Sequence, residues 1–223
     1  MKVIEVNTPA LDHSFVKINA LVNQDNPNYI RPLDNEVLDT FNPAKNKLFK
    51  DGAAKRWIVQ DETGKTIGRI AAFHYKKYIN KGTEFPTGCV GYFDAINDQQ
   101  VANLLFDTAK AWLISEGMEA MDGPVNFGDR DKWWGLMVEG YDREPMYGMS
   151  FNPSYYETLF ANYGFENFYN QYYYHKPLSA DLPDRFKERY EKKHYPLSTY
   201  PGSTYVQRGV AAVLRTEQGQ SIT

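Results

Sequence analysis

The sequence has little of several features that would define a class of protein. Its 223 residues contain one cysteine, Cys89, so no internal disulfide framework and no cysteine-rich zinc site can form. The formal net charge is -3, which disfavours nucleic-acid binding. No apolar run is long enough to span a bilayer, and Glu5 and Asn7 interrupt the N-terminal stretch where a signal peptide is continuously apolar. We therefore expect a cytoplasmic protein with no nucleic-acid and no membrane partner.

Aromatic residues, in contrast, are abundant. Hydrophobic residues make up 42% of the chain and aromatic residues 15%, which is enough apolar surface for one substantial core. The four histidines lack the spacing of metal ligands, so we expect no metal. After residue 178 the sequence becomes charged and then rich in turn residues. We predict one domain over 1–178, followed at 179–223 by a C-terminal helix and tail, either a remnant or a linker to a second lobe.

Hydrophobic periodicity predicts alternating strands and helices. Gly64 is expected to make the turn of a hairpin, and Gly117 and Gly164 are expected to end two helices. Asp12 or Ser14 is the expected cap of the first helix, and Asn152 with Pro153 is expected to open the last. The predicted strands are 2–6, 55–61, 65–76, 89–96, 119–126 and 165–176, and the predicted helices are 14–24, 98–116 and 153–163, with one brief helix somewhere within 25–46.

This order of elements resembles the GCN5-related N-acetyltransferase (GNAT) fold. Residues 90–117, VGYFDAINDQQVANLLFDTAKAWLISEG, resemble the fourth strand and the helix after it. Residues 152–165, NPSYYETLFANYGF, resemble the helix that ends in the family's Tyr-Glu-Lys-Leu-Gly-Phe type signature. The likeness covers residues 1–178 and extends to a group of bacterial GNAT-like proteins with longer chains. It implies an α/β (α+β) fold, with a mixed central sheet splayed between strands 4 and 5 and helices on both faces.

The resemblance implies an acyl-CoA-dependent N-acyltransferase that acylates a small-molecule amine with an acetyl or other acyl group. Asp94 or Asp129 would then help to deprotonate the acceptor ammonium. The tyrosine that many family members use to protonate the leaving thiolate is replaced by Phe160, which is read as a core residue, so Tyr156 or Tyr163 would supply the hydroxyl. The alternative is a catalytically degenerate GNAT-fold module that binds a ligand or a protein.

The segment that would hold coenzyme A departs from the family pattern. The family uses a Gln/Arg-x-x-Gly-x-Gly/Ala loop, whereas AINDQQVAN has no glycine, and Asp94 and Asp98 add negative charge. Asp98 or Asn97 is expected to cap the helix with its own side chain. The resemblance assigns seven residues to acyl-CoA binding: Tyr92, Phe93, Asp94, Asn97, Asp98, Gln99 and Gln100.

The segment 122–145 combines two tryptophans with an excess of acidic residues. If this segment is an insertion beside the cleft, its acidic residues would attract a cationic amine and its tryptophans would stack on that amine. The opposite interpretation is structural, with the tryptophans anchoring a loop whose charges pair with each other. The candidate acceptor-binding residues are Arg130, Trp133, Trp134 and Glu139. Loss of a second lobe would expose one face of the domain, so a homodimer is a further expectation.

Overall fold

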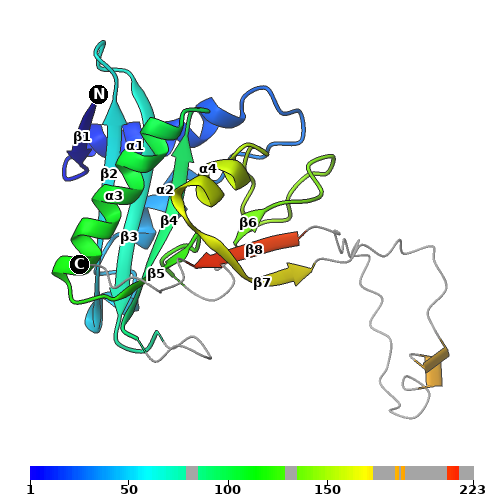
Figure 1. The fold of residues 1–223 in the computed structure, drawn as a ribbon. Helices are drawn as coiled ribbons and strands as arrows, with labels where there is room; N and C mark the ends of the chain where they lie inside the picture. The colour runs from blue at the N-terminus through cyan, green and yellow to red at the C-terminus, as the bar shows by residue number, and fades with distance from the viewer. Residues whose placement is uncertain (79–84, 129–134, 173–183, 186, 189–209, 216–223) are drawn as a thin grey trace.

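The computed structural model describes residues 1–78, 85–128, 135–172, 184–185, 187–188 and 210–215. Eight strands and four α-helices follow one another along these residues (Figure 1). The bounds are β1 (Lys2–Glu5), α1 (Pro9–Asn23), α2 (Asp34–Thr40), β2 (Gly52–Gln60), β3 (Thr66–Tyr75), β4 (Thr87–Ala95), α3 (Gln99–Ser115), β5 (Ala120–Gly123), β6 (Leu136–Met137), α4 (Tyr156–Tyr163), β7 (Glu166–Tyr172) and β8 (Val210–Arg215), with a 3-10 turn at Lys47–Lys50.

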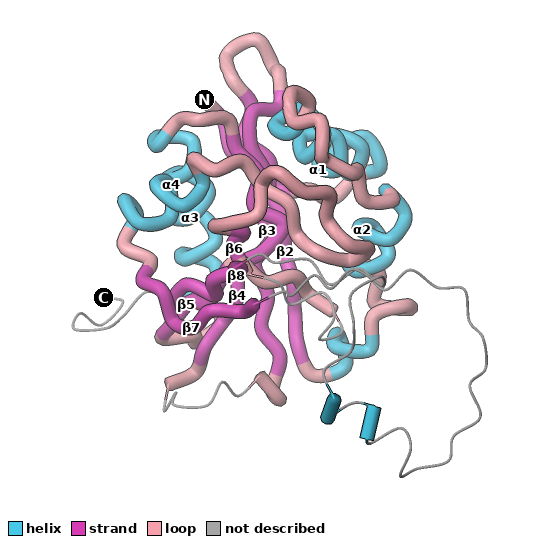
Figure 2. The backbone as a smooth tube through the Cα atoms, turned by 90° about the vertical axis from the view of Figure 1, so that its right-hand side faces the viewer, coloured by secondary structure: helices cyan, strands magenta, loops and turns pink. Residues whose placement is uncertain are grey.

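All eight strands form one mixed sheet in the order β1-β2-β3-β4-β5-β8-β6, with β7 also paired to β8. The β4–β5 pair is parallel, whereas the other neighbouring pairs are antiparallel. Helices α3 and α4 cover one face and α1 and α2 the other, as Figure 2 shows. The predicted mixed sheet with helices on both faces is therefore confirmed.

The strands β4 and β5 run together only at their beginnings. Their register joins Thr87–Cys89 to Ala120–Asp122, after which β5 ends at Gly123 while β4 continues to Ala95. The chain beyond β5 forms further hydrogen bonds with β4, from Val125 N–H to the Val90 carbonyl at 2.8 Å and from Tyr92 N–H to Asn126 Oδ1 at 3.0 Å. Beyond these contacts the two diverge, which confirms the predicted splay between the fourth and fifth strands.

A bulge in β4 lies where the divergence begins. The pairing with β3 shifts between Ala71↔Gly91 and Arg69↔Asp94, so β4 holds one more residue than β3 in this interval. Tyr92 within it has a φ of 48°, a left-handed conformation that is uncommon for a non-glycine residue. The bulge bends β4 away from β5 and brings Asp94 opposite Arg69.

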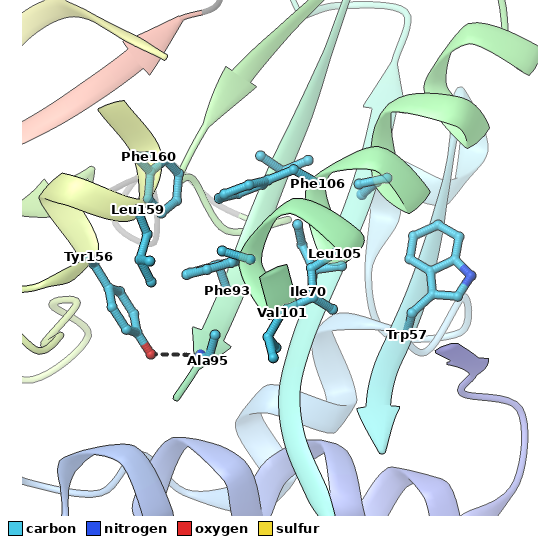
Figure 3. Packing of buried hydrophobic residues seen from close by; sticks show 14 of the residues in the cluster. Trp57, Ile70, Phe93, Ala95, Val101, Leu105, Phe106, Tyr156, Leu159 and Phe160 are labelled. Atoms are coloured by element: carbon cyan, nitrogen blue, oxygen red, sulfur yellow. Dashed lines mark hydrogen bonds between the residues drawn. The ribbon is translucent and has the colours of Figure 1, made fainter. Parts of the chain in front are cut away.

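An aromatic cluster lies within the core under α3 and α4 (Figure 3). Phe93 from β4 stacks on Phe106 from α3, with ring centroids 4.7 Å apart and planes at 8°. Phe160 from α4 meets both rings edge-on, at 5.0 Å and 4.8 Å. Because Phe160 is completely buried in this cluster, its predicted role as a core residue is confirmed.

Two predicted helix starts are wrong. Helix α1 begins before Asp12 and Ser14, because the Thr8 hydroxyl accepts a hydrogen bond from Leu11 N–H at 3.3 Å and Pro9 takes the first turn. Helix α4 begins at Tyr156, and Asn152 is not its cap. The Asn152 side chain instead bonds both backbone groups of Met137, which ties the approach to α4 onto β6. In contrast, Asp98 caps α3 as predicted.

Strand β8 is an element that the sequence pattern does not reveal. It lies in the region 179–223 that was predicted to be a helix and tail, yet it pairs with β5, β6 and β7. Gly64, Gly117 and Gly164 all have the positive φ expected of them. The division of the chain at residue 178 stays a prediction.

Candidate functional site

A cavity of about 510 Å³ opens where β4 and β5 diverge. Its walls come from α1, α2 and the connection between them, from β3, β4 and the chain after β5, and from β6, the segment 145–152 and α4. Most wall residues are apolar, as ligand pockets commonly are. Representative apolar wall residues are Ile30, Leu33, Val37, Leu136, Phe151 and Phe160.

A buried ion pair borders this apolar cavity. Arg69 Nε donates to Asp94 Oδ2 at 2.7 Å, and the two residues are only 4% and 2% exposed. Arg69 reaches Asp94 because the β4 bulge sets the two residues opposite each other. The guanidinium also donates to the Phe15 carbonyl at 2.8 Å and lies 4.8 Å from the centre of the Phe15 ring. Helix α1 therefore contributes to holding the arginine.

Three further side chains complete a polar cluster around Asp94. The Asn19 amide donates to both carboxylate oxygens, at 3.1 Å and 3.2 Å, and the Tyr156 hydroxyl donates to Oδ1 at 3.1 Å. Tyr29 belongs to the cluster through Asn19, because its hydroxyl donates to Asn19 Oδ1 at 2.6 Å. The cluster thus connects α1, the α1–α2 connection, β3, β4 and α4 at a single carboxylate.

The ionisation of the cluster follows from its burial. Burial raises the pKa of Asp94, while the Arg69 charge and the hydrogen bonds from Asn19 and Tyr156 act to lower it. Burial and the nearby Asp94 raise the pKa of Tyr29 to about 12 and raise that of Tyr156 well above its usual value. Both phenols are therefore protonated donors at neutral pH. The carboxylate is a stronger base than an exposed aspartate would be.

Two tyrosines of the α4 region hold the free edge of β4 at its end. The Ala95 N–H donates to the Tyr156 hydroxyl at 3.0 Å, a bond drawn in Figure 3, and the Tyr155 hydroxyl donates to the Ala95 carbonyl at 2.8 Å. Both backbone groups of Ala95 that face the divergence are therefore satisfied by side chains of the same chain. These bonds hold the start of α4 against the last residue of β4, at the end of β4 that is furthest from its pairing with β5.

We expect Tyr156→Phe to destabilise the protein by about 1 to 3 kcal/mol, because it leaves the buried Ala95 N–H without an acceptor. Asp94 loses one donor at the same time. The measurement is the free energy of unfolding from urea denaturation. Tyr155→Phe is the matched control, since it removes only a hydroxyl that donates to the Ala95 carbonyl, and its cost should be smaller. Equal costs would contradict the described geometry.

The start of α3 does not fit a pyrophosphate group. The Asp98 carboxylate accepts the Gln100 N–H at 2.8 Å, so an anion of the chain already occupies this helix terminus. Gln99 is engaged with α4, because its side-chain amide donates to the Leu159 carbonyl at 3.1 Å. We therefore assign no residue of this terminus to the phosphates of coenzyme A.

The structure places the predicted site residues in different surroundings. It brings Asp94 and Tyr156 together in the buried cluster, and it puts Tyr92 and Phe93 beside them on the cavity wall. Asn97 and Gln100 are exposed, and Glu139 is exposed as well and is not part of the cavity wall. Four further predicted site residues lie outside the described residues: Asp129, Arg130, Trp133 and Trp134.

The sequence reasoning missed three members of the cluster, namely Asn19, Tyr29 and Arg69. Only Arg69 carried a local signal, because a cation inside the otherwise apolar strand 65–76 needs a buried partner. In the part of the chain that the structure describes, no group of three or more potential metal ligands gathers. No helix in that part is both long enough and apolar enough to cross a membrane.

The strand order, the parallel β4–β5 pair and its divergence define a GNAT-like fold. No protein-family model matches the chain. It is 30% identical to the bacterial ceramide synthase of Caulobacter vibrioides over 197 residues, which are 86% of this chain and 50% of that protein. It is 31% identical to protein YghO of Escherichia coli over 159 residues, 68% of this chain and 38% of that protein. The chain therefore spans half or less of the curated relatives it matches.

Solved structures similar to the chain include GNAT-family acetyltransferases. One from Kribbella flavida has a TM-score of 0.49 at 12% identity, with 96% of this chain and 95% of that chain covered. One from Staphylococcus aureus has a TM-score of 0.48 at 11% identity, with 95% and 98% covered. Because these values are low, the assignment of the fold rests on the strand order and on the divergence of β4 and β5.

Proposed function

We propose that this chain carries the acyl-transfer site of an N-acyltransferase whose acceptor is an amine with a long hydrocarbon chain. The observation that carries the proposal is the apolar cavity bordered by the buried Asp94 cluster. The cavity offers an apolar space for the hydrocarbon chain of the acceptor, and Asp94 offers a carboxylate for its amine. The relative named bacterial ceramide synthase supports this acceptor class, since a ceramide is the amide of a long-chain amino alcohol and a fatty acid.

The chemistry requires a neutral amine, because an ammonium group has no lone pair to attack a carbonyl. Asp94 is the group that accepts the ammonium proton, and its buried position makes it a better base. The amine nitrogen then forms a bond to the thioester carbonyl carbon, and the carbon–sulfur bond breaks. Tyr156 gives its proton to the leaving thiolate and regains one from Asp94 through the 3.1 Å hydrogen bond. The nitrogen of the tetrahedral intermediate still carries a second proton to be lost, which Asp94, once it has passed its first proton to Tyr156, accepts and then releases to solvent. An ammonium and a thioester thus give an amide, a thiol and one released proton.

The proposed acyl donor is a fatty acyl thioester, with acyl-CoA as the co-substrate. Its nucleotide end has no assigned place, because Asp98 occupies the start of α3 and the Tyr155–Tyr156 pair occupies the end of β4. These two observations favour the second candidate function, a degenerate GNAT-fold module that binds a ligand without chemistry. The two functions differ in whether a thiol is released.

The experiment combines the purified chain with palmitoyl-CoA and a C18 amino alcohol in mixed detergent micelles. Released thiol is followed with a thiol reagent, and the amide product is followed by mass spectrometry. We expect amide formation with the long-chain amine and at least tenfold less with ethanolamine, which has no chain to place in the cavity. Saturable binding of the long-chain amine without thiol release would establish the binding module instead. Neither binding nor thiol release would overturn both functions.

A further inference from the structure

Exposed apolar side chains gather at the mouth of the cavity. Ile30, Leu33 and Tyr147 are 53%, 63% and 83% exposed, although large apolar residues are normally buried. All three also belong to the cavity wall, so their exposed atoms mark its opening. Ile30 and Leu33 lie in the connection between α1 and α2, whereas Tyr147 comes from the segment before α4. Two segments far apart in sequence thus form one apolar rim, defined here as Ile30, Leu33 and Tyr147.

The charges beside the rim offer no attraction to an anionic surface. Arg31 pairs with Asp34 at 2.6 Å, and the Tyr147 hydroxyl donates to Glu36. The net charge of Arg31, Asp34 and Glu36 together is negative. Contact at the rim must therefore be driven by apolar burial, which suits an uncharged or zwitterionic surface.

We propose that the rim docks onto the surface of a lipid bilayer, so that the acceptor chain passes from the bilayer into the cavity without crossing water. The identity of this acceptor rests on the proposed function. An amine with a long hydrocarbon chain resides in membranes, because each methylene group strengthens its partition into lipid. A cavity whose apolar wall continues into an exposed apolar rim is open to such a chain from the lipid side.

The size of the rim favours lipid over a protein partner. A stable protein–protein interface buries about 800 Å² on each partner and engages some twenty residues. Three side chains on two connecting segments are too few for this, whereas apolar side chains inserted at a membrane interface attach reversibly, with a strength that scales with the apolar area they bury. This proposal departs from the sequence-based expectation of no membrane partner, which rested on the lack of an apolar run long enough to span a bilayer.

The test is flotation of the full chain with neutral phosphatidylcholine vesicles. We expect the wild-type chain to float with the vesicles and the variant Ile30→Ser/Leu33→Ser to bind about tenfold more weakly. This variant should still fold, because residue 33 is the N-cap of α2, where serine is preferred over leucine. The matched control is Ile114→Ser, which changes another exposed apolar residue, 42% exposed on α3, away from the cavity wall.

Three results would overturn the inference. They are a wild-type chain that stays in solution, an equal loss in the rim variant and the control, and binding that occurs only with anionic vesicles. Sedimentation showing a dimer that the rim variant disrupts would identify a second copy of the chain as the occupant. The assay is independent of catalysis. Vesicle binding that depends on the rim, without acyl transfer in micelles, would refute only the proposed function. Acyl transfer in micelles without vesicle binding would refute only the docking.

Discussion

Replacing Asp94 with alanine is expected to destabilise the protein by about 3 to 5 kcal/mol, because the substitution leaves the Arg69 guanidinium buried without its counter-ion. Both side chains are almost fully buried, and the atoms that join them lie 2.7 Å apart. The Asn19 amide and the Tyr156 hydroxyl lose their acceptor at the same time. We expect acyl transfer to be lost as well. The measurements are urea denaturation and amide formation in mixed micelles.

A double variant separates the structural role of Asp94 from its chemical role. In Arg69→Met/Asp94→Leu both charges are replaced by apolar groups of similar size, a change that is often neutral or stabilising for a buried pair. We expect this variant to recover most of the lost stability and to remain inactive. Recovery of activity together with stability would refute a role of Asp94 as base. A cost of Asp94→Ala below about 1 kcal/mol would contradict the buried ion pair itself.

The second large effect is expected for Gly91→Ala, at the point where β4 and β5 begin to diverge. A Cβ atom at this position would lie 1.7 Å from the Val125 carbonyl oxygen and 2.6 Å from its carbon. Backbone atoms cannot move aside as a flexible side chain can, so the chain after β5 must shift. That shift breaks the bond from Val125 N–H to Val90. We expect a loss of at least about 3 kcal/mol, measured by thermal and urea unfolding.

Gly64→Ala is the control for this prediction. Gly64 lies in the β2–β3 turn with a φ of +84°, and no atom lies within 4 Å of the Cβ that alanine would add. The cost should therefore be the conformational strain alone, about 1 to 2 kcal/mol. If both variants cost the same, the close approach of Val125 to Gly91 would not exist in solution. Binding and acylation of the long-chain amine should decrease only in Gly91→Ala, because the turn at Gly64 is not part of the cavity wall.

Much of the fold could be predicted from local patterns. The stripe of apolar residues in α3 and the alternation in β2 and β3 depend on neighbours within one element, and periodicity reports these directly. The ends at Gly117 and Gly164 were predictable for the same reason, since a left-handed residue after a helix favours glycine. The divergence of β4 and β5, however, was expected only from the resemblance to the GNAT fold.

The candidate site was harder to predict, because its contacts join segments far apart in sequence. Asn19 and Asp94 are 75 residues apart, and Tyr156 and Asp94 are 62 apart. The start of α1 was misplaced because Asp12 and Ser14 are also good capping residues, although Thr8 followed by Pro9 has the local pattern of a cap and a first-turn proline. Asn152 precedes a proline in the pattern of a helix start, but its amide is used by Met137 on β6. Only the second outcome depended on a partner distant in sequence, since Thr8 caps α1 through Leu11, three residues away.

The position of β8 has a consequence for biosynthesis. Among the residues that the structure describes, β6 and β7 enter the sheet only through β8, and β8 (Val210–Arg215) is made long after β5 (Ala120–Gly123). While the ribosome still holds these residues, β5 has an unpaired edge, and such edges invite association between nascent chains. Chaperone dependence in the cell should therefore fall sharply once translation has passed β8 and released it.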